Sequence, residues 1–208
     1  MQFDQPMAWP VRSREVLGTG FVSSFVDEEV ETPSGETMRR QYVTHPGAVG
    51  VVAWREETDD VAVVRQYRHP VRMELVEIPA GLLDLDGEEY VVAAQRELAE
   101  EAELAADRWE VLVDTCTTPG ACEETLRIFL ARGLRPADRP EGFVLEGEEA
   151  HMTWEFIPRA ALVDAVLAGE CQNPSLVAGI LALETARLSG RLDDLRPADA
   201  PWPIRQGR

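Results

Sequence analysis

The chain has 208 residues, of which 38 are acidic and 20 are basic, so its formal net charge at pH 7 is −18. All 20 basic residues are arginine. This charge argues against nucleic-acid binding, which needs a cationic surface, and equally against docking on anionic lipid. A phosphorylated small molecule remains compatible with it, provided that a metal cation or local arginines offset the repulsion.

Composition predicts a globular protein with one domain and a small additional part. Hydrophobic residues make up 45% of the chain, which is enough for a core. The N-terminal sequence MQFDQPMAWPVRSRE lacks the apolar segment of a secretion signal, and the apolar run Leu176–Leu183 is too short to span a bilayer. The 3 cysteines form no CxxC pair, so we expect free thiols and a cytoplasmic location.

The first half of the chain shows strand patterns separated by turn signals. We expect residues 1–44 to form a small N-terminal β subdomain, because Gly18-Thr19-Gly20 and Pro33-Ser34-Gly35 are turn signals. Three further strands are predicted from apolar runs bounded by turn residues. They cover Ala48–Trp54, the stretch through Val61 and Val64 that ends at the Tyr67–Pro70 loop, and Leu75–Gly81.

The apolar period changes at Glu88–Leu104, where Val91, Ala94, Leu98 and Ala102 recur at helical spacing. The elements expected after this helix are strands at Trp109–Cys116 and Thr125–Leu134, an acidic loop from Arg135 to Ala150, a strand at Met152–Pro158, helices at Pro158–Gly169 and Asn173–Gly190, and a flexible tail over residues 191–208. Strands interleaved with helices predict an α/β (α+β) domain over residues 45–190.

Acidic side chains are concentrated on the predicted helix. Glu97 and Glu101 are four residues apart and therefore project from one helix face, with Glu100 beside them. Carboxylates held this close repel each other unless a cation lies among them, and Mg²⁺ prefers such oxygen ligands. Arg96 could orient one carboxylate by a charge-assisted hydrogen bond. From spacing alone, a solvated acidic helix face is the favoured interpretation, because Glu is a good helix former.

The segment Gly81–Leu104 resembles the Nudix box, whose pattern is G-x5-E-x7-R-E-U-x-E-E-x-G-U, with U an aliphatic residue. The matching residues are Gly81, Glu88, Arg96, Glu97, Leu98, Glu100, Glu101 and Leu104. The loop from Gly81 to Glu88 is one residue longer than the pattern, and Glu103 stands where the family has glycine. Glycine there permits a left-handed helix end, so Glu103 is expected to cost about 1 kcal/mol of strain or to shift the exit path.

The resemblance implies the Nudix fold, a mixed β-sheet sandwiched between helices. Further matches are similar to ADP-ribose pyrophosphatases of the actinobacterial type. They are QYRH at Gln66–His69, EIPAG at Glu77–Gly81, TPG at Thr118–Gly120 and EEA at Glu148–Ala150. This likeness implies Mg²⁺-dependent hydrolysis of ADP-ribose to AMP and ribose 5-phosphate. It also implies a homodimer in which the N-terminal β subdomains exchange and complete the partner's site.

The resemblance also implies roles for single residues near the metal. Glu97 and Glu101 match the metal-binding carboxylates, with Glu100 as an auxiliary ligand and the carbonyl of Ala80 as a backbone ligand. Mg²⁺ is the expected ion, and Mn²⁺ could substitute for it. A bound divalent cation would neutralise phosphate charge and lower the pKa of the attacking water. Glu149, or its neighbour Glu148, would then accept the proton, with Arg96 orienting the carboxylates. Without the resemblance, the two loop glutamates would read as a solvated charge run.

Substrate-binding residues are implied on three segments. They are Arg68, Arg40, Gln41, Pro119 and Gly120. Gln41 replaces the Glu that usually follows the family arginine, and the adenine-stacking aromatic is either Phe21 or Phe25. For Arg68, an ordinary ion pair at a strand end is the alternative.

Two rival functions remain open at this level. The first is the same hydrolysis of another nucleoside diphosphate derivative, such as a nucleotide sugar or a dinucleotide. The second is a non-catalytic Nudix domain that binds a nucleotide and regulates a partner. The intact set of Glu97, Glu100 and Glu101 argues against the second.

Overall fold

The computed structural model describes residues 3–143, 147 and 149–206. The chain divides into two compact units. The small unit consists of Met1–Gly47, Thr115–Thr125 and Pro201–Arg208, and the large unit consists of Ala48–Asp114 and Leu126–Ala200.

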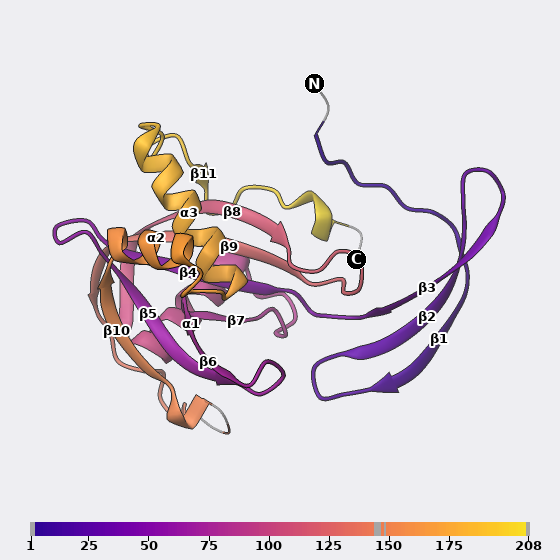
Figure 1. Cartoon of the computed structure of the whole chain (residues 1–208), viewed down its shortest axis with the longest axis horizontal. Helices are drawn as coiled ribbons and strands as arrows, with labels where there is room; N and C mark the ends of the chain where they lie inside the picture. The colour runs from indigo at the N-terminus through magenta and orange to yellow at the C-terminus, as the bar shows by residue number, and fades with distance from the viewer. Residues whose placement is uncertain (1–2, 144–146, 148, 207–208) are drawn as a thin grey trace. The chain divides into compact units, whose positions relative to one another are not determined.

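The small unit contains a three-stranded antiparallel sheet in the order β1 (Val11–Thr19), β2 (Ser24–Glu31), β3 (Thr37–Val43) (Figure 1). All nine residues of β1 are exposed. The end of β3 is tied to a distant loop, because the N–H of Val43 donates to the carbonyl of Ala121 (2.9 Å) and its carbonyl accepts from Glu123 (3.0 Å). The strands expected in this part of the chain thus form a regular sheet, while the subdomain boundary at residue 44 stays a prediction.

The large unit is built on a mixed sheet with the strand order β10-β5-β4-β9-β8-β11, with β6 added to β5 and β7 added to β4. The strand bounds are β4 (Ala48–Arg55), β5 (Asp60–Arg68), β6 (Met73–Glu77), β7 (Ala80–Leu82), β8 (Leu104–Cys116), β9 (Thr125–Pro136), β10 (Thr153–Pro158) and β11 (Arg196–Pro197). Strand β4 pairs in parallel with β9 and antiparallel with β5 and β7. It therefore lies in the middle of the sheet, in keeping with its almost wholly buried, apolar sequence.

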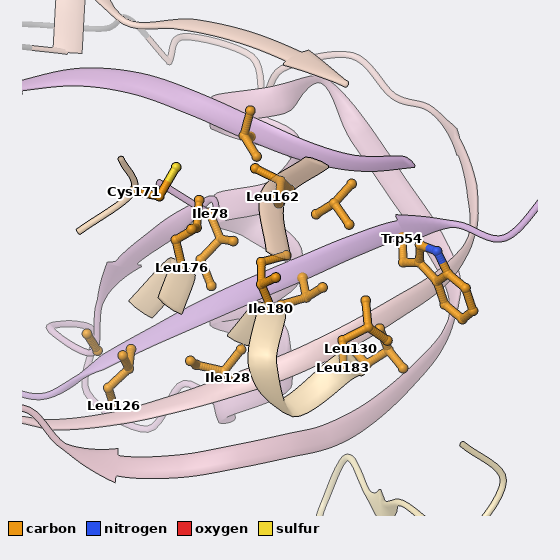
Figure 2. Packing of buried hydrophobic residues seen from close by; sticks show 14 residues of the cluster. Trp54, Ile78, Leu126, Ile128, Leu130, Leu162, Cys171, Leu176, Ile180 and Leu183 are labelled. Atoms are coloured by element: carbon orange, nitrogen blue, oxygen red, sulfur yellow. The ribbon is translucent and has the colours of Figure 1, made fainter. Parts of the chain in front are cut away.

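Helices cover both faces of this sheet. The helices are α1 (Tyr90–Ala102), α2 (Arg159–Ala168) and α3 (Pro174–Leu188). Leu162 of α2 and Ile180 of α3 pack with Val52 of β4 in one core cluster, part of which Figure 2 shows. Leu98 of α1 packs with Val51 in a second cluster on the other face. Because neighbouring residues of a strand point to opposite faces, one buried strand supplies both cores. The expected α/β fold with a sheet between helices is confirmed.

The predicted strand at Leu75–Gly81 is two strands in the structure. Strand β6 ends at Glu77 and β7 begins at Ala80, with Pro79 between them. Proline has no N–H and cannot continue a ladder from both sides. The break moves the chain from pairing with β5 to pairing with β4, where Ala80 lies opposite Gly50.

The C-terminal residues, expected to form a flexible tail, include β11 and a short 3-10 helix at Pro203–Arg205. The side chains of Ala200 and Trp202 are buried. Another 3-10 helix, Glu149–His151, precedes β10. None of the helices in the described ranges is both long and apolar enough to cross a membrane.

Candidate active site

Helix α1 buries carboxylates as well as apolar side chains. Its apolar stripe packs on the sheet, as the helical spacing predicted. Glu97, Glu100 and Glu101 are only 8%, 8% and 7% exposed. A solvated acidic face, the alternative interpretation, therefore does not describe these three residues. Burying a carboxylate is costly unless it is paired or hydrogen-bonded, so their partners matter.

Arg96 is the centre of this acidic group. Its Nε and Nη2 each donate to Glu88 at 3.2 Å, while Nη1 donates to Glu97 at 2.6 Å and to Glu100 at 3.2 Å. Burial lowers the pKa of Arg96, but the hydrogen bonds with Glu88 and Glu97 and the negative charge of Glu97 and Glu100 outweigh it and raise the pKa above its usual value. Arg96 therefore stays charged, and three carboxyl groups surround this one guanidinium.

The longer loop before α1 leaves this network intact. In the motif, seven residues separate Glu88 from Arg96, and here the Glu88 carboxylate still accepts hydrogen bonds from the Arg96 guanidinium. The extra residue is absorbed between Gly81 and Glu88, where Gly87 adopts a positive φ of 78°.

The backbone of β7 approaches the carboxylates closely. The N–H of Ala80 donates to Oε2 of Glu101 at 2.9 Å. A Cβ atom placed on Gly81 would overlap the carboxyl group of Glu97. Glycine is required at this position because of that close approach, and not because of its backbone angles. Strand β7 and helix α1 thus hold Glu97 and Glu101 in place from two sides.

The donor chemistry of this group fits a hard divalent cation. Carboxylate oxygens are the preferred ligands of Mg²⁺, and excess negative charge around one arginine is what such an ion offsets. Within the described ranges, no three His, Cys, Asp or Glu side chains are arranged to hold a metal ion. Glu97 and Glu100 are directed toward Arg96, and Glu101 toward Ala80. The metal roles of these residues and of the Ala80 carbonyl therefore stay predictions.

Glu103 ends α1 in the left-handed conformation that the family glycine permits. Its φ and ψ are 53° and 39°, and its N–H reaches the carbonyl of Ala99 at 3.2 Å. Arg139 reinforces this helix end, since its Nε donates to the carbonyl of Glu100 at 2.8 Å and its Nη2 lies 3.1 Å from the carboxylate of Glu103. The helix therefore keeps the expected exit path, at the cost of a strained non-glycine residue.

The proposed general base lies in the loop before β10. Glu149 begins the 3-10 helix Glu149–His151, and the alternative, Glu148, lies outside the described residues. The proton-accepting role of either residue remains a prediction.

Four of the predicted substrate residues line one cavity in the small unit. The cavity has a volume of about 380 Å³, within the range of small-molecule sites, and Arg40, Gln41, Pro119 and Gly120 all contribute to its wall. Thr125 also lines it, and its buried hydroxyl has no hydrogen-bond partner in the part of the chain that the structure describes. The β3 and TPG-loop segments are thus brought together, although nearly 80 residues separate them in the sequence.

Arg68, the fifth predicted substrate residue, lies in the large unit and forms an ion pair with Glu77. Of the two candidate stacking aromatics, Phe21 is fully exposed and Phe25 is 43% exposed. Sequence reasoning assigned no role to Glu77 or Thr125. The signal for Glu77 was a single acidic residue at the end of an apolar strand, directly before a proline-containing turn.

Known proteins resemble this chain in sequence and in fold. The NUDIX domain family matches residues 44–173. An ADP-ribose pyrophosphatase of Mycobacterium tuberculosis is 40% identical over 190 residues, which is 91% of this chain and 89% of that protein. A methanol dehydrogenase activator of Bacillus methanolicus is 38% identical over 62% of this chain and 68% of that protein.

A crystal structure of an ADP compounds hydrolase has the same fold, with a TM-score of 0.69 at 20% identity over 91% of this chain and all of that one. The family match covers more than half of the chain, and it includes the whole acidic helix. The predicted family is confirmed, and the chain belongs to the Nudix family.

Proposed function

We propose that this protein is a divalent-metal-dependent pyrophosphatase that hydrolyses ADP-ribose to AMP and ribose 5-phosphate. The observation that carries the substrate is the 40% identity, over nine tenths of both chains, to an ADP-ribose pyrophosphatase. The observation that supports the reaction type is the buried carboxylate cluster of α1, in which the carboxyl groups outnumber the one arginine.

Glu97, Glu101 and the Ala80 carbonyl are the residues that we propose as metal ligands, with Glu100 as an auxiliary carboxylate. A bound Mg²⁺ or Mn²⁺ would supply Lewis acidity to the diphosphate and to the attacking water. Arg96 holds Glu97 and Glu100 in a fixed orientation through its hydrogen bonds. Glu149 accepts the proton of the attacking water, and Glu148 is the neighbouring alternative.

The cavity in the small unit is the proposed site for the non-reacting part of the substrate. Arg40 and Gln41 offer hydrogen-bond donors, while Pro119 and Gly120 form another part of the wall. Arg68 in the large unit is proposed to contact a phosphate group, because its side chain is 41% exposed and its guanidinium fork suits phosphate oxygens. Phe21 and Phe25 remain the candidates for stacking on adenine.

We further propose a cytoplasmic homodimer. The support for the dimer is the sheet of the small unit, where β1 exposes every residue, including Val11, Val16 and Leu17. Exposed apolar strands of this kind commonly mark an interface. Light scattering coupled to gel filtration measures the molecular mass, and a monomer at micromolar concentration would contradict this part of the proposal.

One assay tests the proposed function. The purified protein is incubated with ADP-ribose, with nucleotide sugars and with dinucleotides, each with Mg²⁺, with Mn²⁺ and with a chelator, and the products are identified. AMP and ribose 5-phosphate should form from ADP-ribose only when metal is present. Preferred turnover of a nucleotide sugar would keep the reaction type but reject the substrate. Absence of turnover with every compound would reject the enzyme.

The role of Glu149 has its own test. Glu149→Gln removes the proton acceptor but leaves α1 untouched, so turnover should fall on the order of a hundredfold while the metal affinity stays within about threefold of the wild type. Stopped-flow turnover and calorimetric titration with Mn²⁺ measure the two quantities. An unchanged rate would assign the base to another residue, and Glu148→Gln is the matched variant to compare.

A further inference from the structure

Glu77 is a buried carboxylate to which the proposed reaction gives no role. It is 2% exposed, less than any of the three glutamates of α1. A buried charge needs a close partner, and here the partner is the guanidinium of Arg68. Nε of Arg68 donates to Oε1 at 2.9 Å, and Nη2 donates to Oε2 at 2.6 Å. The arginine side chain is itself 41% exposed, so the pair links an interior carboxylate to a surface cation.

The register of the sheet places this pair on the face that carries α1. Glu77 lies opposite Val64 and Met73 lies opposite Arg68 in the antiparallel pairing of β5 with β6. Residues separated by an even number of positions along a strand share a face. Ala62 belongs to the core cluster that packs on α1, and Arg68 is six positions further along β5. Arg68 and Glu77 therefore share a face with the acidic cluster.

Glu77 also belongs to the segment that holds the acidic cluster. Three residues after it, the N–H of Ala80 binds Glu101, and the next residue, Gly81, lies against the carboxyl group of Glu97. The turn between β6 and β7 thus fixes the proposed metal ligands through its backbone. The same turn fixes Arg68 through the side chain of Glu77, the last residue of β6.

We propose that Glu77 is a positioning residue that holds Arg68 toward a phosphate group of the nucleoside diphosphate substrate. This inference rests on the proposed function, and it gives a role to a residue that lies outside the Nudix box. The guanidinium is planar, so a carboxylate bound at the Nε and Nη2 edge leaves the Nη1 edge facing away from it. Glu77 therefore sets both the plane of Arg68 and the direction of its other edge.

A double-mutant cycle tests the proposal. Steady-state kinetics with ADP-ribose are measured for the wild type, Glu77→Gln, Arg68→Ala and the double variant. Glu77→Gln should raise KM about tenfold and change kcat less than about twofold, because the positioned group acts in substrate binding. In the Arg68→Ala background the same substitution should not change KM further. Glu77→Asp keeps the charge and should recover part of the loss.

An unchanged KM in Glu77→Gln, or the same increase in both backgrounds, would overturn the proposal. The control is Glu110→Gln, which removes the carboxylate of the Arg132–Glu110 pair (2.6 Å). Arg132 lies two residues after Leu130 on the opposite, α2–α3 face of the sheet. This control should lower the unfolding midpoint and leave KM unchanged. A tenfold rise in KM for the control would mean that Glu77 acts only through stability, which also overturns the proposal.

A binding measurement separates failure of this inference from failure of the proposed function. Calorimetry with ADP-ribose in the presence of a chelator gives a dissociation constant without turnover. A wild type that binds ADP-ribose but does not hydrolyse it with any metal would reject the proposed function. In that case a weaker affinity of Glu77→Gln, by about tenfold, would still support the positioning role, and equal affinities would reject it.

Discussion

Two clusters of the large unit both pair arginine with carboxyl groups, but they differ in the ratio of the two. Around Arg96, one guanidinium is shared by Glu88, Glu97 and Glu100. Arg127 is 0% exposed, and its partner is Asp114. Asp114 binds two guanidinium groups, that of Arg127 at 2.8 Å and that of Arg196 at 2.7 Å. The first cluster has an excess of carboxylates, and the second has an excess of arginine.

We infer that this difference separates a cluster that the fold needs from one that a ligand needs. Asp114 joins β8 to β9 and to the C-terminal strand β11, and Arg127 also donates to the carbonyl of Ala200 at 2.7 Å. Each group there has a role in connecting elements. Beside Arg96, three carboxylates share one guanidinium, and carboxylates held this close repel each other when they are ionised. We infer that this excess is kept for a cation.

The largest effect is expected at Glu101, the α1 carboxylate beside the Arg96 cluster. Glu101→Gln removes a proposed metal ligand, yet it keeps an oxygen that can accept the hydrogen bond from Ala80. Activity toward ADP-ribose should fall on the order of a thousandfold, since metal stabilisation of the transition state is worth several kcal/mol. The free energy of unfolding should change by less than about 1 kcal/mol. Comparable losses in kcat/KM and in stability would mean that the cluster is structural.

The opposite outcome is expected in the Arg127 cluster. Asp114→Ala leaves a fully buried guanidinium without its carboxylate, which should lower the free energy of unfolding by about 3 to 5 kcal/mol. Denaturant titration measures this loss. Specific activity, determined well below the unfolding midpoint, should stay within about twofold of the wild type. A stable but inactive variant would remove the distinction between the two clusters.

The smallest effect concerns the end of α1. Glu103→Gly relieves the left-handed conformation of a non-glycine residue and loses a partly exposed ion pair with Arg139, so unfolding should require up to about 1 kcal/mol more free energy. Glu103→Ala is the matched control, since it keeps the strain and loses the ion pair. It should be slightly less stable than the wild type. Equal stability of the glycine and alanine variants would show that the strain is negligible.

The family, the fold and the acidic helix could be predicted because they depend on local patterns. The apolar stripe of α1 and the spacing of Arg96, Glu97 and Glu101 are visible in a short window of sequence. The pairing of Glu77 with Arg68 depends on the register between two strands, which a single sequence does not contain. Proline at position 79 was a readable signal for the break between β6 and β7, and the continuous apolar run concealed it.

Only some residues of the cavity in the small unit could be predicted, because its wall also depends on pairing between distant segments. The resemblance assigned Arg40, Gln41, Pro119 and Gly120 to substrate binding. The buried hydroxyl of Thr125 could not be foreseen, because it lines the cavity only after the loop between β8 and β9 pairs with the end of β3.

The left-handed Glu103 has a consequence for recognising distant relatives. A pattern search that demands glycine at this position would pass over the chain, although the helix ends in the same conformation. Arg139, 36 positions later in the printed sequence, binds both Glu103 and the carbonyl of Glu100, so tolerance at one site depends on the residue at another. A motif that accepts either glycine alone or an acid with a distant arginine would find relatives that the strict pattern omits.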